Sequence, residues 1–486
     1  MKKKVIAAAV AATLGHTVVN AVSVNTDGLG QVLLFPYYTV QGSAATDNFD
    51  TLISIVNTTD EVKAVKIRFR EAKASHEVLD FNIYMSPKDV WVAAVVPDAG
   101  GGAKILTNDT TCTVPIVPAT GVPFRNSEYD PAQNGVDDGA GVGLDRTKEG
   151  YFEVIEMGVV NDTDSTPAAA ASPAPFVPAT WATHVNGNPG DCASLNAAWA
   201  GGSWSNPPAG FVSGDLNVTA PTGGLFGSVS LVNVNEGTDY GYDGVALNDF
   251  FAPANQDNDL HRDPGTTLPT LADVDPKVSV VLNGNTVVNS SWGLGNVVDP
   301  VSAVLMKTKM MNDYATDPGI DAATSFVYTM PTKNFYVPIG QGLVAEQPFT
   351  QSFFGSACED VSYTAWDREE QTEIPITSVD FSPRPPQVVA PSALCFEANV
   401  VRLNGKDALS SQTATNELTS KFVNGWISAD LSAGHNLVDD DGNTYIGLPV
   451  IGFSAQRYFN GTLAGNSTLS NYGGLFAHKS MTVISS

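Results

Sequence analysis

The chain has 486 residues, of which 51 are acidic and 25 are lysine or arginine, so its net charge at neutral pH is −26. A surface with this excess of acids repels polyanions, and we therefore expect neither nucleic acid nor an anionic membrane as a partner. Hydrophobic residues make up 43% of the chain and charged residues 16%, which indicates a folded protein with a real core and not a disordered acidic tail.

The N-terminal residues have the pattern of an export signal. Three lysines at 2–4 precede an apolar run over 5–14, and the small-residue site Val19-Asn20-Ala21 follows. We predict that 1–21 is a signal peptide, because signal peptidase reads this arrangement. Its removal takes away three lysines and no acid, which lowers the net charge from −26 to −29. We expect export through the inner membrane to the extracellular space or outer cell surface, with the periplasm as the alternative, and no transmembrane segment in the mature chain.

The four cysteines are even in number and lie in a chain predicted to be exported, so two disulfides are expected. Three connectivities exist for four cysteines. We favour Cys112 with Cys192 and Cys358 with Cys395, because neighbours in sequence usually share a local unit, and each closed loop should contribute roughly 3 to 5 kcal/mol. Metal ligation is the alternative, but no C-x-x-C or Cys/His spacing supports it.

Alternation of apolar and polar side chains predicts strands over 52–96. Residues 65–70 alternate apolar with cationic side chains, which is typical of a half-buried strand. Turn-forming residues at 57–60 and 86–89 separate the strands, so we expect an antiparallel meander. A strand that ends in Asn-Thr-Thr-Asp at 57–60, ahead of a strongly alternating strand, resembles the immunoglobulin-like sandwiches of bacterial envelope proteins.

Other regions give weaker predictions. A helix is expected over 300–312, because Asp299 can serve as N-cap and Pro300 fits a first turn. The Ala/Pro/Gly-rich stretch 162–215 predicts a long surface loop, part of which should pack on the body through its tryptophans. Further strands are predicted at 151–160, 225–234, 278–282, 326–330, 335–338, 425–431, 445–457 and 475–483.

Together these patterns predict an all-β, mainly antiparallel fold of immunoglobulin-like β-sandwich domains with long loops and one or two short helices. The expected divisions are an N-terminal β-sandwich region over 22–161, the loop 162–215, a central β region over 216–345 and a C-terminal β region over 346–486. The segments 223–237, 330–335 and 366–370 resemble an uncharacterised group of secreted β-rich proteins of Gram-negative bacteria. That resemblance implies export and a β-rich body, and it implies no activity.

Motifs for catalysis are absent from the sequence. It holds no H-E-x-x-H pair, no G-x-S-x-G elbow and no Walker loop, so we predict no catalytic residue. Asp367 and Glu369 would share one strand face and could form the carboxylate pair of a glycoside hydrolase. Arg368 between them favours surface ion pairing instead.

Acidic loops suggest calcium. Asp439, Asp441 and Asn443 have the one-apart spacing of an EF-hand loop, although the glycine falls at the fourth position, and Asp257 and Asp259 form a second candidate. The alternative is an ordinary polar turn, for which Asp-Gly is a strong signal. Apart from Ca²⁺, no cofactor is expected.

A cationic stripe stands out in this acidic chain and consists of Lys63, Lys66, Arg68, Arg70 and Lys73. We predict that it binds a neighbouring copy or a cell-surface glycan. The alternative is that these side chains lie on the solvent-exposed face of a strand and bind no partner. The function expected is a non-enzymatic exported structural, assembly or adhesive protein of the bacterial cell exterior, stabilised by Ca²⁺. The alternative is a carbohydrate-active enzyme or a carbohydrate-binding protein.

Overall fold

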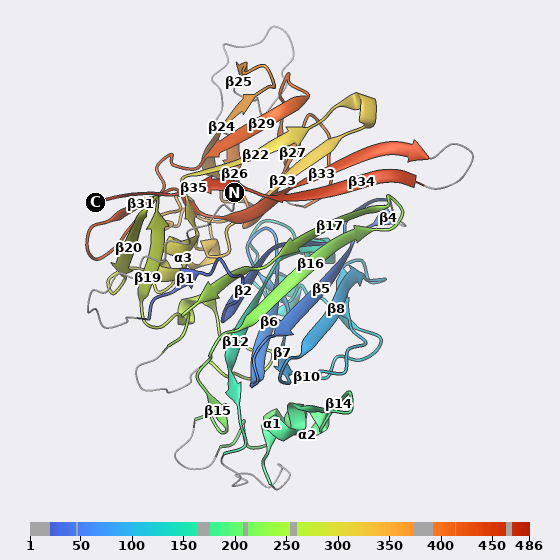
Figure 1. Ribbon diagram of the computed structural model, residues 1–486, viewed down its shortest axis with the longest axis vertical. Helices are drawn as coiled ribbons and strands as arrows, with labels where there is room; N and C mark the ends of the chain where they lie inside the picture. The colour runs from blue at the N-terminus through green and yellow to red at the C-terminus, as the bar shows by residue number, and fades with distance from the viewer. Residues whose placement is uncertain are drawn as a thin grey trace, which may run out of the picture.

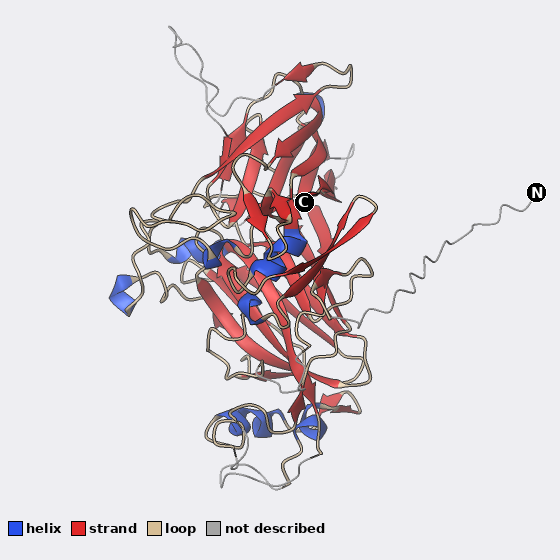
Figure 2. Cartoon of the chain, turned by 90° about the vertical axis from the view of Figure 1, so that its left-hand side faces the viewer, coloured by secondary structure: helices blue, strands red, loops and turns tan. Residues whose placement is uncertain are grey.

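The computed structural model describes residues 20–44, 47–163, 175–207, 212–252, 260–373, 392–413, 415–462 and 469–486. Strands dominate this part of the chain, nearly all of their pairings are antiparallel, and it contains three α-helices. The prediction of an all-β, mainly antiparallel fold is therefore confirmed. Figure 1 shows two stacked bodies of sheet, and Figure 2 shows the short helices at the margins of the strands.

The lower body in Figure 1, here called the N-terminal sandwich, consists of two sheets packed face to face. The first sheet has eight strands, in the order β1 (Ser23–Val24), β18 (Val245–Asn248), β2 (Val32–Thr39), β12 (Glu149–Val160), β6 (Val62–Glu71), β7 (Glu77–Met85) and β10 (Cys112–Val114), with β15 (Val218–Thr219) beside β12. The second has six, in the order β11 (Val122–Pro123), β9 (Ala103–Leu106), β8 (Val90–Pro97), β5 (Asp50–Asn57), β16 (Leu225–Asn233) and β17 (Thr238–Asp243).

The upper body, the C-terminal sandwich, also has two sheets. One sheet has the order β25 (Thr372–Glu373), β24 (Glu359–Trp366), β29 (Asn424–Asp430), β22 (Lys309–Ala315) and β35 (Lys479–Met481), with β26 (Ser392–Leu394) beside β24. The other has the order β28 (Thr415–Leu418), β27 (Ala398–Leu403), β23 (Ala323–Thr329), β33 (Ile451–Thr462) and β34 (Leu469–Ala477).

Smaller elements connect and cover these sheets. The short strands are β3 (Gly42–Ala44), β4 (Asp47–Asn48), β13 (His184–Val185), β14 (Asn188–Pro189), β19 (Val278–Asn283), β20 (Thr286–Ser291), β21 (Met306–Lys307), β30 (Asn436–Val438), β31 (Thr444–Ile446), β32 (Leu448–Pro449) and β36 (Val483–Ser485). The α-helices are α1 (Pro178–Ala182), α2 (Cys192–Trp199) and α3 (Asp299–Leu305).

Aromatic residues fill the core of the N-terminal sandwich. The rings of Phe35 on β2 and Phe152 on β12 stack with centroids 4.3 Å apart, and Phe81 on β7 meets Trp91 on β8 across the two sheets at 5.9 Å. The alternating inward residues of both sheets supply this core, as period-two sequences require.

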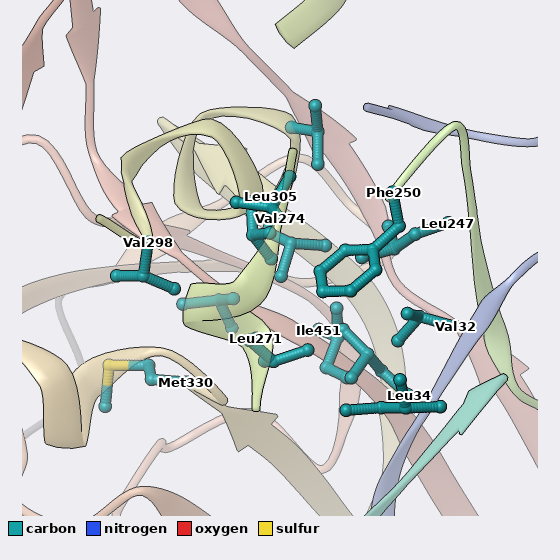
Figure 3. Packing of buried hydrophobic residues seen from close by; sticks show 14 of the residues in the cluster. Val32, Leu34, Leu247, Phe250, Leu271, Val274, Val298, Leu305, Met330 and Ile451 are labelled. Carbon is teal, nitrogen blue, oxygen red and sulfur yellow. The ribbon is translucent and has the colours of Figure 1, made fainter. Parts of the chain in front are cut away.

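A second apolar cluster joins the two sandwiches. Figure 3 shows Val32 and Leu34 of β2 facing Phe250, Leu271 and other buried side chains of the segment that follows β18. The outer face of the eight-stranded sheet is thus covered by protein and not by water. Both faces of its central strands are consequently buried.

Several predictions need correction. The strands over 52–96 do not form a meander, because β5 pairs with β8 in one sheet while β6 pairs with β7 in the other. The chain therefore crosses between sheets after β5 and again after β7. A helix is present where one was expected, but Asp299 is its first residue and not its N-cap, which is Val298. Helix α3 ends at Leu305 and not at residue 312, because the following residues pair as β22 with β29. Residues 335–338 form no strand: Phe335 ends the 3₁₀ turn Lys333–Phe335, and 336–338 continue without regular structure.

The expected divisions do not coincide with the sheets. Strands β16, β17 and β18 lie within the predicted central region, yet they complete both sheets of the N-terminal sandwich. Within the predicted loop 162–215, the described parts hold α1 and α2, which bury Trp181, Trp199 and Trp204. The expectation that its tryptophans pack on the body is confirmed.

Candidate functional site

Both predicted disulfides are present. Cys112 is bonded to Cys192, which ties β10 to the start of α2, and Cys358 is bonded to Cys395, which ties the start of β24 to the end of β26. Each bridge closes a local unit of the fold, as the pairing of sequence neighbours predicted.

The cationic stripe is not an exposed surface. The side chains of Lys63, Lys66 and Arg68 have no exposed area, and that of Arg70 is 10% exposed. Lys73 is half-buried, and its ammonium group donates to the carbonyl of Ala140 at 2.9 Å. The prediction that these cations form an exposed partner-binding surface is therefore wrong for Lys63, Lys66, Arg68 and Arg70, because their side chains are buried.

Internal carboxylates neutralise these cations. Lys63 Nζ lies 2.8 Å from Glu156 Oε1, and Lys66 Nζ lies 2.6 Å from Asp80 Oδ2. Arg68 donates to Glu77 at 2.7 Å. Such buried pairs hold the interior together only while both partners are present, because an unpaired buried charge is costly.

A distant segment covers this face of β6. Lys66 Nζ also donates to the carbonyl of Asp263 at 3.3 Å, and Arg68 Nη1 donates to the carbonyl of Pro269 at 2.8 Å. Alternation along β6 cannot reveal a cover supplied by residues nearly 200 positions later.

A pocket of about 450 Å³ lies at the edge of this ionic network. Its acids are Glu77, Asp80 and Glu128, a set that the sequence analysis missed because they come from separate segments. Burial and the charge of Asp80 raise the pKa of Glu77 to about 7, although Arg68 opposes the shift. Each acid already accepts a hydrogen bond from within the protein: Glu77 from Arg68, Asp80 from Lys66, and Glu128 from the backbone N–H of Glu77. The arrangement favours a structural role.

The acidic loop at 439–443 is organised as a turn. Asp439 Oδ1 accepts from the backbone N–H groups of Asp441 and Asn443 at 3.0 and 2.7 Å, and its Oδ2 accepts from Asn443 Nδ2 at 2.7 Å. Among the described residues, no group of three or more His, Cys, Asp or Glu side chains is placed to hold a metal ion. Asp257 and Asp259 lie outside the described residues. Calcium binding stays a prediction.

The outer face of the six-stranded sheet is the candidate functional surface. We call it the association face, and it consists of Leu106 on β9, Val90, Val92, Ala94 and Val96 on β8, Leu52, Ser54 and Val56 on β5, and Phe226, Ser228, Ser230 and Val232 on β16. These side chains are apolar or are serines, but the same outward row of β5 also carries Asp50, which pairs with Val232, and Asp109 borders the face. Leu52, Val90, Val92 and Phe226 are 40–46% exposed.

Strand pairing explains how these residues meet. Leu52 on β5 lies between Ala94 on β8 and Ser230 on β16, and Ser54 lies between Val92 and Ser228. The opposite faces of the same strands carry the buried core, so both faces of this sheet are largely apolar. Near-continuous runs such as Val90 to Val96 were the available sequence signal.

The association face is hollowed and has charged borders. A shallow hollow of about 800 Å³ lies over β8 and β5, beside the loop that follows β9. Lys104 on β9 stands at one edge, level with Val96. Asp239 and Asp243 on β17 stand exposed at the other edge. The face is thus mainly apolar, with Lys104 at one edge, Asp239 and Asp243 at the other, and Asp50 in its central strand.

Comparison with known proteins adds no constraint: no protein-family model, curated protein or solved structure matches the chain. Within the described ranges, no helix combines the length and the apolar character needed to cross a bilayer.

Proposed function

We propose that this protein is an exported, non-enzymatic structural component of the bacterial cell exterior whose copies assemble through the association face. The observation that carries the proposal is a mainly apolar sheet face with exposed Leu52, Val90, Val92 and Phe226, and with Asp50 at one end, on a chain of net charge −26. Contiguous exposed apolar surface marks interaction sites in soluble proteins.

Charge favours a second copy as the occupant. Two molecules with this excess of acid repel one another over most of their surface, but less across a face that is mainly apolar. A two-fold axis parallel to the strands and passing over β5 would turn one sheet face onto the other. The β9 edge of each copy would then lie over the β17 edge of its mate.

That rotation brings complementary groups together. Lys104 pairs with Val96, and Asp239 pairs with Val232. Val95 and Leu231 both pair with Thr51, so the next residues, Val96 and Val232, lie at one common level of the sheet. Lys104 and Asp239 therefore stand at the same level on opposite edges. Lys104 of each copy would therefore meet Asp239 of the other, twice per dimer. Phe226 of one copy would cover Val90 of the other, and the Leu52 side chains would meet near the axis. The two Asp50 carboxyl groups, whose pKa burial raises, would also come close to each other there, which opposes the association. Such self-complementarity is the requirement of a two-fold interface.

Export and the resemblance to immunoglobulin-like sandwiches remain part of the proposal. The basic and apolar N-terminal residues fit a signal peptide, and two disulfides suit an oxidising compartment. Immunoglobulin-like sandwiches are common in cell-surface proteins. Association through a sheet face would suit a building block of such a surface.

Sedimentation equilibrium tests the proposal. The wild-type protein should be dimeric at about 100 µM, and Leu52→Glu should make it monomeric, because the substitution replaces the central apolar contact by two carboxylates beside the two Asp50 carboxyl groups at the axis. Val287→Glu is the matched control, since Val287 is 54% exposed on β20 and lies outside the association face.

A charge exchange distinguishes this geometry from other contacts. Lys104→Glu and Asp239→Lys should each weaken the dimer, and the double variant should restore it, because the two sites face each other in the proposed dimer. A monomeric wild type, or a Leu52→Glu variant that associates as the wild type does, would contradict the proposal.

A further inference from the structure

Two tryptophans on the C-terminal sandwich are not part of its core. Five of the seven tryptophans are buried: Trp91, Trp181, Trp199, Trp204 and Trp292. Trp366 is half-buried, and Trp426 is 40% exposed. They are register partners on β24 and β29, and their rings stack with centroids 4.0 Å apart and an angle of 8° between planes. The pair forms a rigid aromatic platform facing outward.

A groove of about 520 Å³ runs beside this platform. Met311, Asn312 and Asp313 of β22 form its floor, Trp426 stands on one side, and Phe476 of β34 stands on the other with 45% of its surface exposed. Its volume falls in the range of small-molecule sites, roughly 300 to 1,000 Å³.

The path of the chain creates the groove. After β34 the chain crosses to the other sheet, and β35 pairs with β22 only from Lys309 to Met311. Beyond that point β35 no longer pairs with β22, and side chains take over: Gln456 Nε2 donates to the carbonyl of Asp313 at 3.0 Å, and Thr324 exchanges hydrogen bonds with Ala315. Asn312 Nδ2 donates to the carbonyl of Phe476 at 3.0 Å, which fixes the distance between floor and wall.

Polar groups stand at defined positions in the groove. Asp313 pairs in register with Trp426, and its carboxylate accepts from Gln456 Nε2 at 3.2 Å. Gln456 is in turn held by the hydroxyl of Tyr458, which donates to its Oε1 at 2.6 Å. Lys479 lines the same groove and is exposed.

The charges decide between ligand classes. A quaternary ammonium group would gain from the aromatic rings and from Asp313, but Lys479 would repel it. An acidic sugar would be attracted by Lys479 but repelled by Asp313. A neutral sugar meets neither penalty, since its hydroxyl groups can donate to a carboxylate and accept from an ammonium group.

We propose that this groove binds a neutral sugar unit of a glycan. The apolar C–H face of the ring would lie against Trp426 and Phe476, while its hydroxyl groups would pair with Asp313 and Lys479. This binding site lies on the C-terminal sandwich, and it is independent of the association face. It would give an exported protein a means to attach to a polysaccharide.

Tryptophan fluorescence provides the direct test. Neutral oligosaccharides built from glucose, galactose, mannose and N-acetylglucosamine would be titrated into the full-length protein, with choline and a sialylated oligosaccharide as competing ligand classes. At least one neutral oligosaccharide should change the emission saturably below about 10 mM, because the other five tryptophans are buried away from ligand.

Variants assign the signal to the groove. Trp426→Ala and Asp313→Ala should each weaken binding about tenfold by calorimetry, a change that removal of one stacked ring or one ionic hydrogen bond produces. Tyr472→Ala is the matched control: Tyr472 is 58% exposed on β34 but does not line the groove, and its removal should leave affinity unchanged. Circular dichroism melting would verify that all three variants fold.

Three outcomes would overturn the proposal. One is the absence of saturable binding by every neutral oligosaccharide. Another is tighter binding of choline or of the sialylated sugar, which would refute the ligand class. The third is binding that persists unchanged in a folded Trp426→Ala variant, which would place the sugar elsewhere.

Discussion

Replacing Lys63 by methionine should strongly destabilise the protein. Lys63 and Glu156 have no exposed side-chain area, and their charged atoms lie 2.8 Å apart. Methionine retains much of the apolar stem but leaves the Glu156 carboxylate without its cation. Removing one member of a buried pair costs about 3 to 5 kcal/mol. For a unit the size of the N-terminal sandwich, that loss corresponds to a fall in Tm of ~6 to 20 °C.

The deficit should also depend on pH. Burial already raises the pKa of Glu156, and loss of Lys63 removes the nearest charge that opposes this shift. A carboxyl group whose folded pKa lies above its unfolded value contributes stability below the unfolded pKa, and this is lost as pH rises through the folded pKa. The Lys63→Met variant should therefore approach wild-type stability near pH 4.5 and diverge from it toward pH 8.

Chemical unfolding of two further variants makes the test decisive. Lys88→Met is the surface control, because Lys88 and Asp60 form a pair whose side chains are 58% and 89% exposed, and its loss should matter little. Adding Glu156→Gln to Lys63→Met should recover part of the loss, since no buried charge is then left alone. If Lys63→Met behaves like Lys88→Met across this pH range, the reasoning about a buried ion pair is refuted.

Three more predictions follow from other contacts. Reduction of the Cys112–Cys192 bridge should lower Tm and expose the 162–215 segment to proteases, and a reduced protein with an unchanged cleavage pattern would contradict this. In the presence of a chelator, Asp439→Ala should lower the free energy of unfolding by about 1 to 3 kcal/mol, because several donors lose their acceptor. A rise in wild-type Tm between chelator and about 5 mM Ca²⁺ would support the calcium prediction. Burial lowers the pKa of His76, but hydrogen bonds to Asp138 and Glu128 and the charges of Glu71 and Asp138 together outweigh it and raise the value to about 9. The stabilisation by this residue should therefore be complete below pH ~6.5 and lost as pH rises through about 9, with His76→Gln showing a flatter pH profile of Tm.

Local patterns predicted the strands better than their arrangement. Alternation over 65–70 correctly identified β6, but the burial of its cations depends on a cover that includes Pro269. Spacing indicated a helix after Asp299, and the pairing of β22 with β29 ended it early. Both failures have one cause: a partner distant in sequence overrides local propensity.

The candidate sites differ in how visible they were. The disulfides followed from cysteine order alone. Apolar runs such as 90–96 encode the association face, but from these runs we predicted only strands and not an exposed apolar surface. The groove beside Trp426 depends on the register that sets Asp313 and Phe476 next to that ring, and no motif in the sequence encodes such a register.

The late position of β16, β17 and β18 has a consequence for biogenesis. Until the chain has been synthesised as far as Asn248, β5 lacks one of its two neighbours or β2 has an unpaired edge. During that interval the nascent chain presents open strand edges that can pair with other chains. We therefore expect the nascent chain to need protection, for example by a holding chaperone, until its first 248 residues are available for folding. A fragment that ends at Val160 should aggregate instead of folding.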